Sequence, residues 1–211
     1  MAEIRKNPHP LLLLTIGLLF ATPLCAFDQP SVNIGFTSFV DGGPPAGPGF
    51  YYSAYLQYYT ADELVDHPNP AAQSTNVDVW VLLNQFIYQS DQSLLGAKWG
   101  MNVILPVIDI VSSNSAVPEN GAGLGDLWVG PYLQWDPIMG DKGPIFMQRV
   151  EFQMIFPSGQ YDHNKALNPG SNFFSFDPYW AGTWFIMPRW TASTRVHYLW
   201  NDKTNDPSTV L

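Results

Sequence analysis

The chain has 211 residues, of which 46% are hydrophobic, so it can bury enough apolar surface for one sizeable domain. Only 13% of the residues are charged, about half the fraction that is usual in soluble domains, while 15% are aromatic. The formal net charge is −9 and no basic run occurs, which argues against nucleic acid as a partner. With 19 prolines and 17 glycines, long helices are not expected.

The first 26 residues have the pattern of a secretory signal peptide. Two basic residues precede an apolar run over residues 11–21, which is too short to span a bilayer. We expect cleavage after Ala26, whereas a lipoprotein site at Cys25 is disfavoured because the residue before it is bulky. Cys25 is the only cysteine, so the exported chain is expected to lack disulfides. No later stretch is apolar enough for a transmembrane helix.

Residues 27–48 are rich in glycine and proline, and we expect them to form an irregular arm before a domain over residues 49–211. In that domain, six stretches alternate between two faces with a period of two, which is typical of β-strands, and a seventh, residues 173–186, is apolar on both faces. The most regular stretch, residues 94–107, has a wholly apolar face and a face of small or polar residues. The predicted strands are residues 50–59, 75–88, 94–107, 126–135, 145–156, 173–186 and 190–201.

The connections between these strands alternate long and short, as in outer-membrane barrels with short periplasmic turns and long external loops. Aromatic residues at the strand ends suit the two membrane interfaces. We therefore predict an all-β fold, an antiparallel up-and-down transmembrane β-barrel with apolar side chains toward lipid. Seven strands is an odd number and residues 206–211 have a loop composition, so we expect a fragment of a larger, even-numbered barrel.

If the polar faces point inward, a mixed set of charged and polar side chains lines the lumen. Rings of such groups can orient a solute by their field. They can equally form internal ion pairs that fill and stiffen a narrow barrel, and Arg149 and Glu151, on one side of a strand, are well placed to pair. The candidate lumen-lining residues are Lys98, Asn102, Asp126, Arg149, Glu151, Gln153, Asp177, Arg195 and His197.

We expect no catalytic residue, cofactor or metal. Two loop clusters hold titratable groups, but neither has the three or four ligands of a metal site nor an orienting partner for a catalytic histidine. Ser158 is not in a nucleophile-elbow motif, and the glycine-rich stretch over residues 121–125 lacks the lysine of a phosphate loop. The two clusters are Asp66-His67, and Asp162-His163 with Lys165.

Four short motifs resemble an outer-membrane family named for a role in the meta-cleavage pathway of phenol degradation. The similarity spans roughly residues 50–201. The resemblance implies an outer-membrane β-barrel and uptake of aromatic or other hydrophobic compounds, and it supplies no catalytic residues. The motifs are Leu105-Pro106, Gly121-Ala122-Gly123-Leu124-Gly125-Asp126-Leu127, Phe156-Pro157-Ser158-Gly159-Gln160-Tyr161 and Asn168-Pro169-Gly170-Ser171-Asn172.

The function we expect is a channel or uptake protein of the bacterial outer membrane, in contact with lipid and with a small hydrophobic or aromatic solute, and without enzymatic activity. Two alternatives stay open. A secreted, soluble β-sandwich that binds a ligand would pack its apolar faces together. An outer-membrane enzyme would need a cluster of serine, histidine and an acid at one rim.

Overall fold

The computed structural model describes residues 39–64, 73–113, 119–187 and 189–202. The predicted signal peptide, the arm before Phe39 and the Asp66-His67 pair lie outside these residues. None of the described segments is a helix long and apolar enough to cross a membrane.

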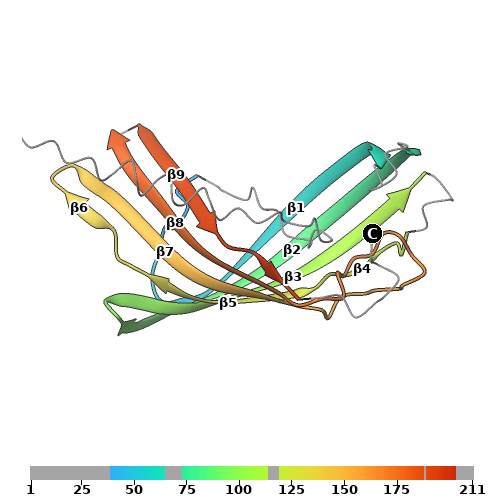
Figure 1. Cartoon of the computed structure of the whole chain (residues 1–211). Helices are drawn as coiled ribbons and strands as arrows, with labels where there is room; N and C mark the ends of the chain where they lie inside the picture. Colours follow the sequence, from blue (N-terminus) through green and yellow to red (C-terminus); the bar gives the residue numbers. More distant parts are fainter. Residues whose placement is uncertain (1–38, 65–72, 114–118, 188, 203–211) are drawn as a thin grey trace, which may run out of the picture.

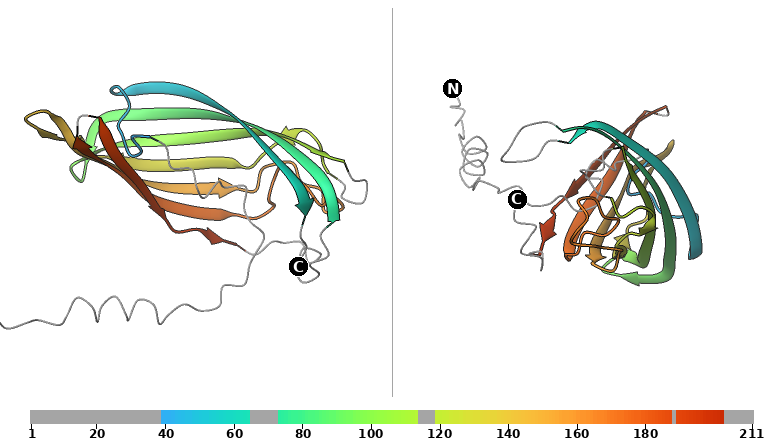
Figure 2. Two further views of the ribbon diagram at one scale, coloured as in Figure 1. Left: turned by 90° about the horizontal axis from the view of Figure 1, so that it is seen from above. Right: turned by 90° about the vertical axis from the view of Figure 1, so that its right-hand side faces the viewer.

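All ten strands of the described residues join one antiparallel sheet, which is curled into an open trough (Figures 1 and 2). Its long strands follow one another in chain order, with only short pieces paired beside them. The long strands are β1 (Gly49–Leu64), β2 (Gln73–Leu94), β3 (Ala97–Ser112), β5 (Leu127–Gln134), β7 (Gly143–Phe156), β8 (Ser175–Met187) and β9 (Trp190–His197), and the short ones are β4 (Gly123–Leu124), β6 (Ile138–Gly140) and β10 (Trp200–Asn201).

The all-β, up-and-down architecture predicted from the sequence is confirmed. Each predicted strand corresponds to one long strand, and the last of them is divided into β9 and β10, which both pair with β8. Consecutive long strands are hydrogen-bonded neighbours, so the trough is a meander without crossovers. This is the arrangement of a barrel wall that has not closed in the described part of the chain.

The first short connection lies elsewhere than predicted. The sequence placed a link over residues 89–93, but β2 continues to Leu94 and the turn consists of Leu95 and Gly96. Both turn residues have positive φ, 53° and 75°, as a two-residue hairpin turn with the twist of its strands requires. Leucine rarely adopts a positive φ, so Leu95 gave no indication of a turn. The turn signal in the sequence was Gly96, a single glycine next to apolar residues.

The strands at the long-loop end also extend further than predicted. β1 continues to Leu64 and β3 to Ser112, beyond the predicted strand ends at residues 59 and 107. Residues 138–140, predicted as part of a short link, form β6 and pair with β7. Backbone pairing with a neighbouring strand satisfies the N–H and C=O groups in these segments whatever the side chains are.

The two faces of the sheet differ in polarity. In β7, the Phe152 side chain on the convex face is 43% exposed, while Glu151 beside it on the concave face is 0% exposed. The convex face carries most of the exposed large apolar side chains, and its aromatic rings pack in pairs across neighbouring strands. Examples are Tyr58 with Trp80, Phe50 with Tyr88, Tyr88 with Trp99, and Phe146 with Trp184.

Candidate functional site

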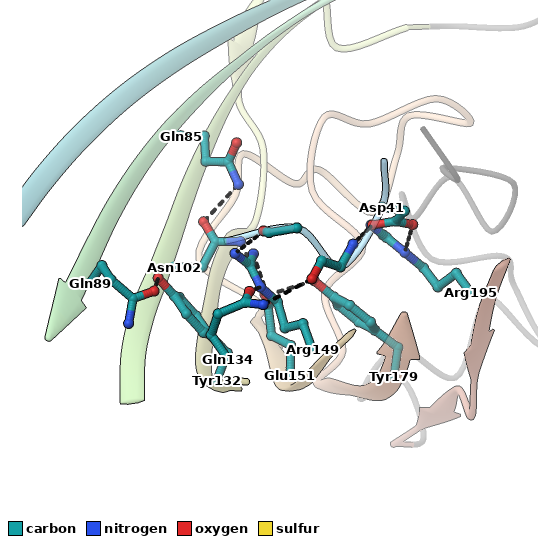
Figure 3. A network of polar contacts seen from close by, with 12 residues as sticks. Asp41, Gln85, Gln89, Asn102, Tyr132, Gln134, Arg149, Glu151, Tyr179 and Arg195 are labelled. Atoms are coloured by element: carbon teal, nitrogen blue, oxygen red, sulfur yellow. Dashed lines mark hydrogen bonds and ion pairs between the residues drawn. The ribbon is translucent and has the colours of Figure 1, made fainter. Parts of the chain in front are cut away.

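The most concentrated polar chemistry of the molecule lies on the concave face, around the carboxylate of Glu151 (Figure 3). This carboxylate accepts hydrogen bonds from Asn102 Nδ2 at 3.0 Å and from the Tyr179 hydroxyl at 2.6 Å. Arg149 Nη1 lies 4.0 Å from Glu151 Oε2. β3, β7 and β8 therefore place one buried carboxylate beside two hydrogen-bond donors and one guanidinium group, which compensate for its loss of water.

On the β2 side, the network continues through amide groups and a tyrosine. Gln85 Nε2 donates to Asn102 Oδ1 at 3.0 Å, which fixes the orientation of the Asn102 amide toward Glu151. The Tyr132 hydroxyl donates to Gln89 Oε1 at 3.0 Å. Hydrogen bonds between side chains thus cross β2, β3, β5 and β7 without leaving the concave face.

Two glycines make room for this network. A Cβ on Gly100 would lie 2.1 Å from the Tyr132 ring, and a Cβ on Gly130 would lie 2.3 Å from Glu151 Oε1. Any larger residue would displace the tyrosine or the carboxylate, because such contacts are far inside van der Waals distance. The alternation of small and large residues along β3 and β5 is therefore part of the packing of the polar network.

The end of the N-terminal arm is bound to the same face, although the sequence suggested only an irregular segment. Arg195 on β9 donates two hydrogen bonds to Asp41, from Nε to Oδ2 and from Nη2 to Oδ1, both at 2.9 Å. The guanidinium carbon of Arg195 lies 4.3 Å from the centroid of the Tyr179 ring, and Thr183 Oγ1 donates to the backbone carbonyl of Asp41 at 2.8 Å. A bidentate ion pair of this geometry is among the strongest polar contacts in proteins.

The next two residues of the arm are held by their backbone carbonyls. Gln134 Nε2 donates to the Gly42 carbonyl at 2.9 Å, and Arg149 Nη2 donates to the Gly43 carbonyl at 3.2 Å. Gly42 has a φ of 77°, and a Cβ there would lie 2.5 Å from the Ala181 carbonyl oxygen. The arm can approach β8 this closely only because residue 42 is glycine.

The charges of this cluster balance within it. Arg195 pairs with Asp41, and Arg149 lies near Glu151 while its Nε donates to Gln134 Oε1 at 2.8 Å. The Arg149 guanidinium also lies 4.3 Å from the Tyr132 ring centroid. These contacts match the internal ion pairs that the sequence suggested as one of two interpretations.

Two of the sequence-predicted residues lie away from this cluster. Lys98 is at the short-turn end of β3, where its Nζ lies 3.1 Å from the exposed Asp136. Asp126 is fully buried before β5, and its two oxygens accept the backbone N–H groups of Gly159 and Ser171 at 2.9 Å and 2.8 Å. Asp126 thus fastens the long loop between β7 and β8 to the sheet.

Three further predicted residues form a second polar group on the concave face. His197 Nδ1 on β9 lies 3.0 Å from Asp177 Oδ1 on β8. Gln153 on β7 is buried and is the register partner of Asp177. The structure therefore unites Asn102, Arg149, Glu151 and Arg195 in one network and places these three residues beside it.

The sequence missed seven members of the network: Asp41, Gln85, Gln89, Tyr132, Gln134, Tyr179 and Thr183. Six of them lie on strands, but tyrosine counts as apolar in a period-two pattern, and threonine and glutamine are common on any strand. Asp41 lies in the arm, where no periodicity exists. One signal in the sequence could have revealed Tyr132: it lies opposite Gly100 on the neighbouring strand, which leaves room for its ring.

Toward the long loops, the concave face becomes apolar. One buried cluster contains Leu83, Ile104, Trp128 and Ile155 from four strands. A second cluster contains Val77, Ile108 and Ile110, with Leu167 from the β7–β8 loop packed against it. The concave face thus changes from a polar region near the short turns to an apolar region near the long loops.

The loop cluster around Asp162 is a local turn. The backbone N–H and the side-chain amide of Asn164 donate to Asp162 Oδ1 at 2.9 Å and 3.1 Å, and they hold the pKa of Asp162 below its usual range. Ser158 Oγ accepts the Leu127 N–H at 3.1 Å, so its hydroxyl joins the loop to β5. Among the described residues, no group of three histidine, cysteine or acidic side chains is placed to hold a metal ion.

Comparison with known proteins gives one family and one fold. A model of the family described as "Putative MetA-pathway of phenol degradation" matches residues 61–210. The crystal structure of the COG4313 outer membrane channel from Pseudomonas putida F1 superposes with a TM-score of 0.64 at 18% sequence identity, and the match covers 80% of this chain and 62% of the channel. At this identity the likeness shows the fold, and this chain spans less than two thirds of that channel. No curated protein matches the sequence.

Proposed function

The chain belongs to the family described as "Putative MetA-pathway of phenol degradation", and we propose that it forms a channel of the bacterial outer membrane that admits small aromatic or other hydrophobic compounds. The observation that carries the proposal is the opposite polarity of the two faces of the curled sheet. Apolar side chains cover the convex face, and buried charged groups lie on the concave face. A membrane barrel needs this distribution, with lipid outside and a polar interior.

The convex face supports contact with lipid. Leu56 is 69% exposed on β1, and its register partner Leu82 and the next strand's Val107 are exposed beside it. Such a band of exposed aliphatic side chains would be costly in water and is favourable in a bilayer. The soluble sandwich lacks support, because all the described strands belong to one sheet and no second sheet packs on either face among them.

The concave face supports a route for solutes of low charge. We propose that the nine residues predicted to line the lumen do so, with Asp126 and Lys98 near its two ends. Since Asp41, Arg149, Glu151 and Arg195 balance one another, the narrow polar region holds no excess charge of either sign that would attract a particular ion. The apolar clusters near the long loops would favour an uncharged, hydrophobic solute.

The arm narrows this route. Asp41, Gly42 and Gly43 are tied by side chains of β5, β7, β8 and β9, so they occupy the trough near its short-turn end. In our proposal the space left beside the arm sets the size limit of the channel.

Uptake by whole cells tests the proposal. The full-length protein is expressed in a bacterial host that lacks its own major porins, and the uptake of labelled phenol and of a labelled disaccharide is measured at micromolar concentration. We expect several-fold faster phenol uptake than in cells with an empty vector, and unchanged disaccharide uptake. Equal acceleration of both solutes would indicate a general pore, and acceleration of neither would contradict a channel.

A further inference from the structure

The four short motifs through which the sequence resembles its family meet at one place, at the long-loop end of the sheet. The Gly125 N–H donates to the Pro106 carbonyl at 2.9 Å, and the Gln160 N–H donates to the Leu124 carbonyl at 2.8 Å. The Gly170 N–H in turn donates to the Gln160 carbonyl at 3.0 Å, so backbone hydrogen bonds join all four motifs. The motifs come from distant parts of the chain, and their contact indicates one shared structural role.

That role is to fix the base of the β7–β8 loop, residues 157–174. The loop leaves β7 and returns to β8 past the fully buried carboxylate of Asp126, which accepts the N–H of Gly159 on the way out and the N–H and hydroxyl of Ser171 on the way back. The two passing segments touch, because a Cβ on Gly159 would lie 2.8 Å from the Gly170 Cα. The base of the loop cannot open without leaving a buried carboxylate unpaired.

From this base the loop turns into the trough. Viewed from the long-loop end, it lies inside the curve of the sheet (Figure 2, right). The Asn120 N–H donates to the Leu167 carbonyl at 2.9 Å and joins the tip of the loop to the β3–β5 connection. The Leu167 side chain packs against the second apolar cluster of the concave face, which contains Val77 and Ile110. The loop therefore covers the concave face of β2 and β3 with an apolar side chain.

An apolar side chain at this level acts against ions. An ion gives up part of its hydration shell in a narrow passage only where polar groups replace the water, and Leu167 and the cluster beneath it offer only aliphatic surface. A hydrophobic solute gains free energy when it leaves water for such a surface. The charged groups of the concave face lie nearer the short turns, so they do not compensate an ion at the level of Leu167.

We propose that the β7–β8 loop is a fixed constriction at the outer mouth of the channel, and that Leu167 is a specificity-determining residue there, which disfavours hydrated ions and polar solutes and admits hydrophobic ones. The inference rests on the proposed channel, whose long loops face outward. It adds a second narrow level to the one at the arm. The four motifs of the family resemblance together position this one side chain.

Single-channel recording of Leu167→Ser tests the constriction, because serine is smaller and polar at the same position of the loop. The full-length protein is inserted into planar bilayers in potassium chloride. We expect the conductance to be at least about twofold that of the unsubstituted protein, since water and ions then enter the passage more easily. The matched control is Ala166→Ser, at the exposed neighbouring residue of the same loop, which should leave the conductance unchanged.

The fixed position of the loop is tested on the unsubstituted protein by amide hydrogen exchange. The N–H groups of Gly159, Gly170 and Ser171 should exchange as slowly as those in the middle of β7, because Asp126 and Gln160 hold them. Fast exchange of these three groups would show that the loop opens, and it would overturn the fixed constriction even if Leu167→Ser fails to fold.

The recordings separate this inference from the proposed channel. Unchanged conductance in Leu167→Ser would overturn the constriction alone, because the unsubstituted protein still conducts. An equal rise in Ala166→Ser would overturn the role of Leu167, since any change in the loop would then have the same effect. Absence of current from the unsubstituted protein would overturn the channel itself.

Discussion

Glu151→Leu should lower the free energy of unfolding by about 3–5 kcal/mol, the usual cost of breaking a buried ion pair by removing one partner. The variant leaves the Arg149 guanidinium without its anion and removes the acceptor of the Asn102 amide and the Tyr179 hydroxyl. Leucine has a similar volume, so packing changes contribute little. The measurement is a urea titration of the full-length protein in phospholipid vesicles.

Two control variants separate charge from hydrogen bonding. Glu151→Gln keeps one acceptor oxygen and the size of the side chain, so it should cost less than Glu151→Leu. The double variant Arg149→Met/Glu151→Leu should be more stable than Glu151→Leu alone, because no buried charge is then left without a partner. A loss below about 1 kcal/mol for Glu151→Leu would mean that water reaches the carboxylate and that the network is not closed.

Leu56→Arg should cost about 2 kcal/mol in the same titration and reduce the yield of inserted protein. Its side chain lies on the convex face, two residues before Tyr58 on the same face of β1, and the Tyr58 ring packs against that of Trp80. Arginine on the lipid face of a barrel costs about 2–4 kcal/mol at the bilayer midplane and less toward the interface.

The matched control is the next residue of the same strand. Gln57 points to the concave face, where it pairs in register with Val81, so Gln57→Arg introduces the same side chain at the same depth on the opposite side. We expect this variant to insert and to lose much less stability than Leu56→Arg. Equal losses for the two variants would contradict the assignment of the convex face to lipid.

The strands and their faces could be predicted because the period-two pattern is a direct consequence of strand geometry. The alternation of Phe152 with Glu151 gives the polarity of the two sides of the sheet. The hairpin at Leu95 and Gly96 could not be predicted, because backbone conformation rather than composition defines it.

The candidate site could be predicted only in part. Arg149, Glu151 and Asn102 were found because a charged or amide group on a regular strand is conspicuous. Asp41 was not assigned a role, since its contact with Arg195 joins residues 154 positions apart and no local pattern encodes it. Contacts of this range are set by the register of the whole sheet and by the glycine that lets the arm approach it.

The claim that the concave face is the interior of a channel can be tested by cysteine modification during current recording. The full-length protein is inserted into planar bilayers as Gln57→Cys or Leu56→Cys and exposed to a charged, water-soluble thiol reagent, with the unsubstituted protein as control. We predict that the reagent changes the single-channel conductance of Gln57→Cys and leaves that of Leu56→Cys unchanged. A change in Leu56→Cys with none in Gln57→Cys, or no channel current from the full-length protein, would contradict this account.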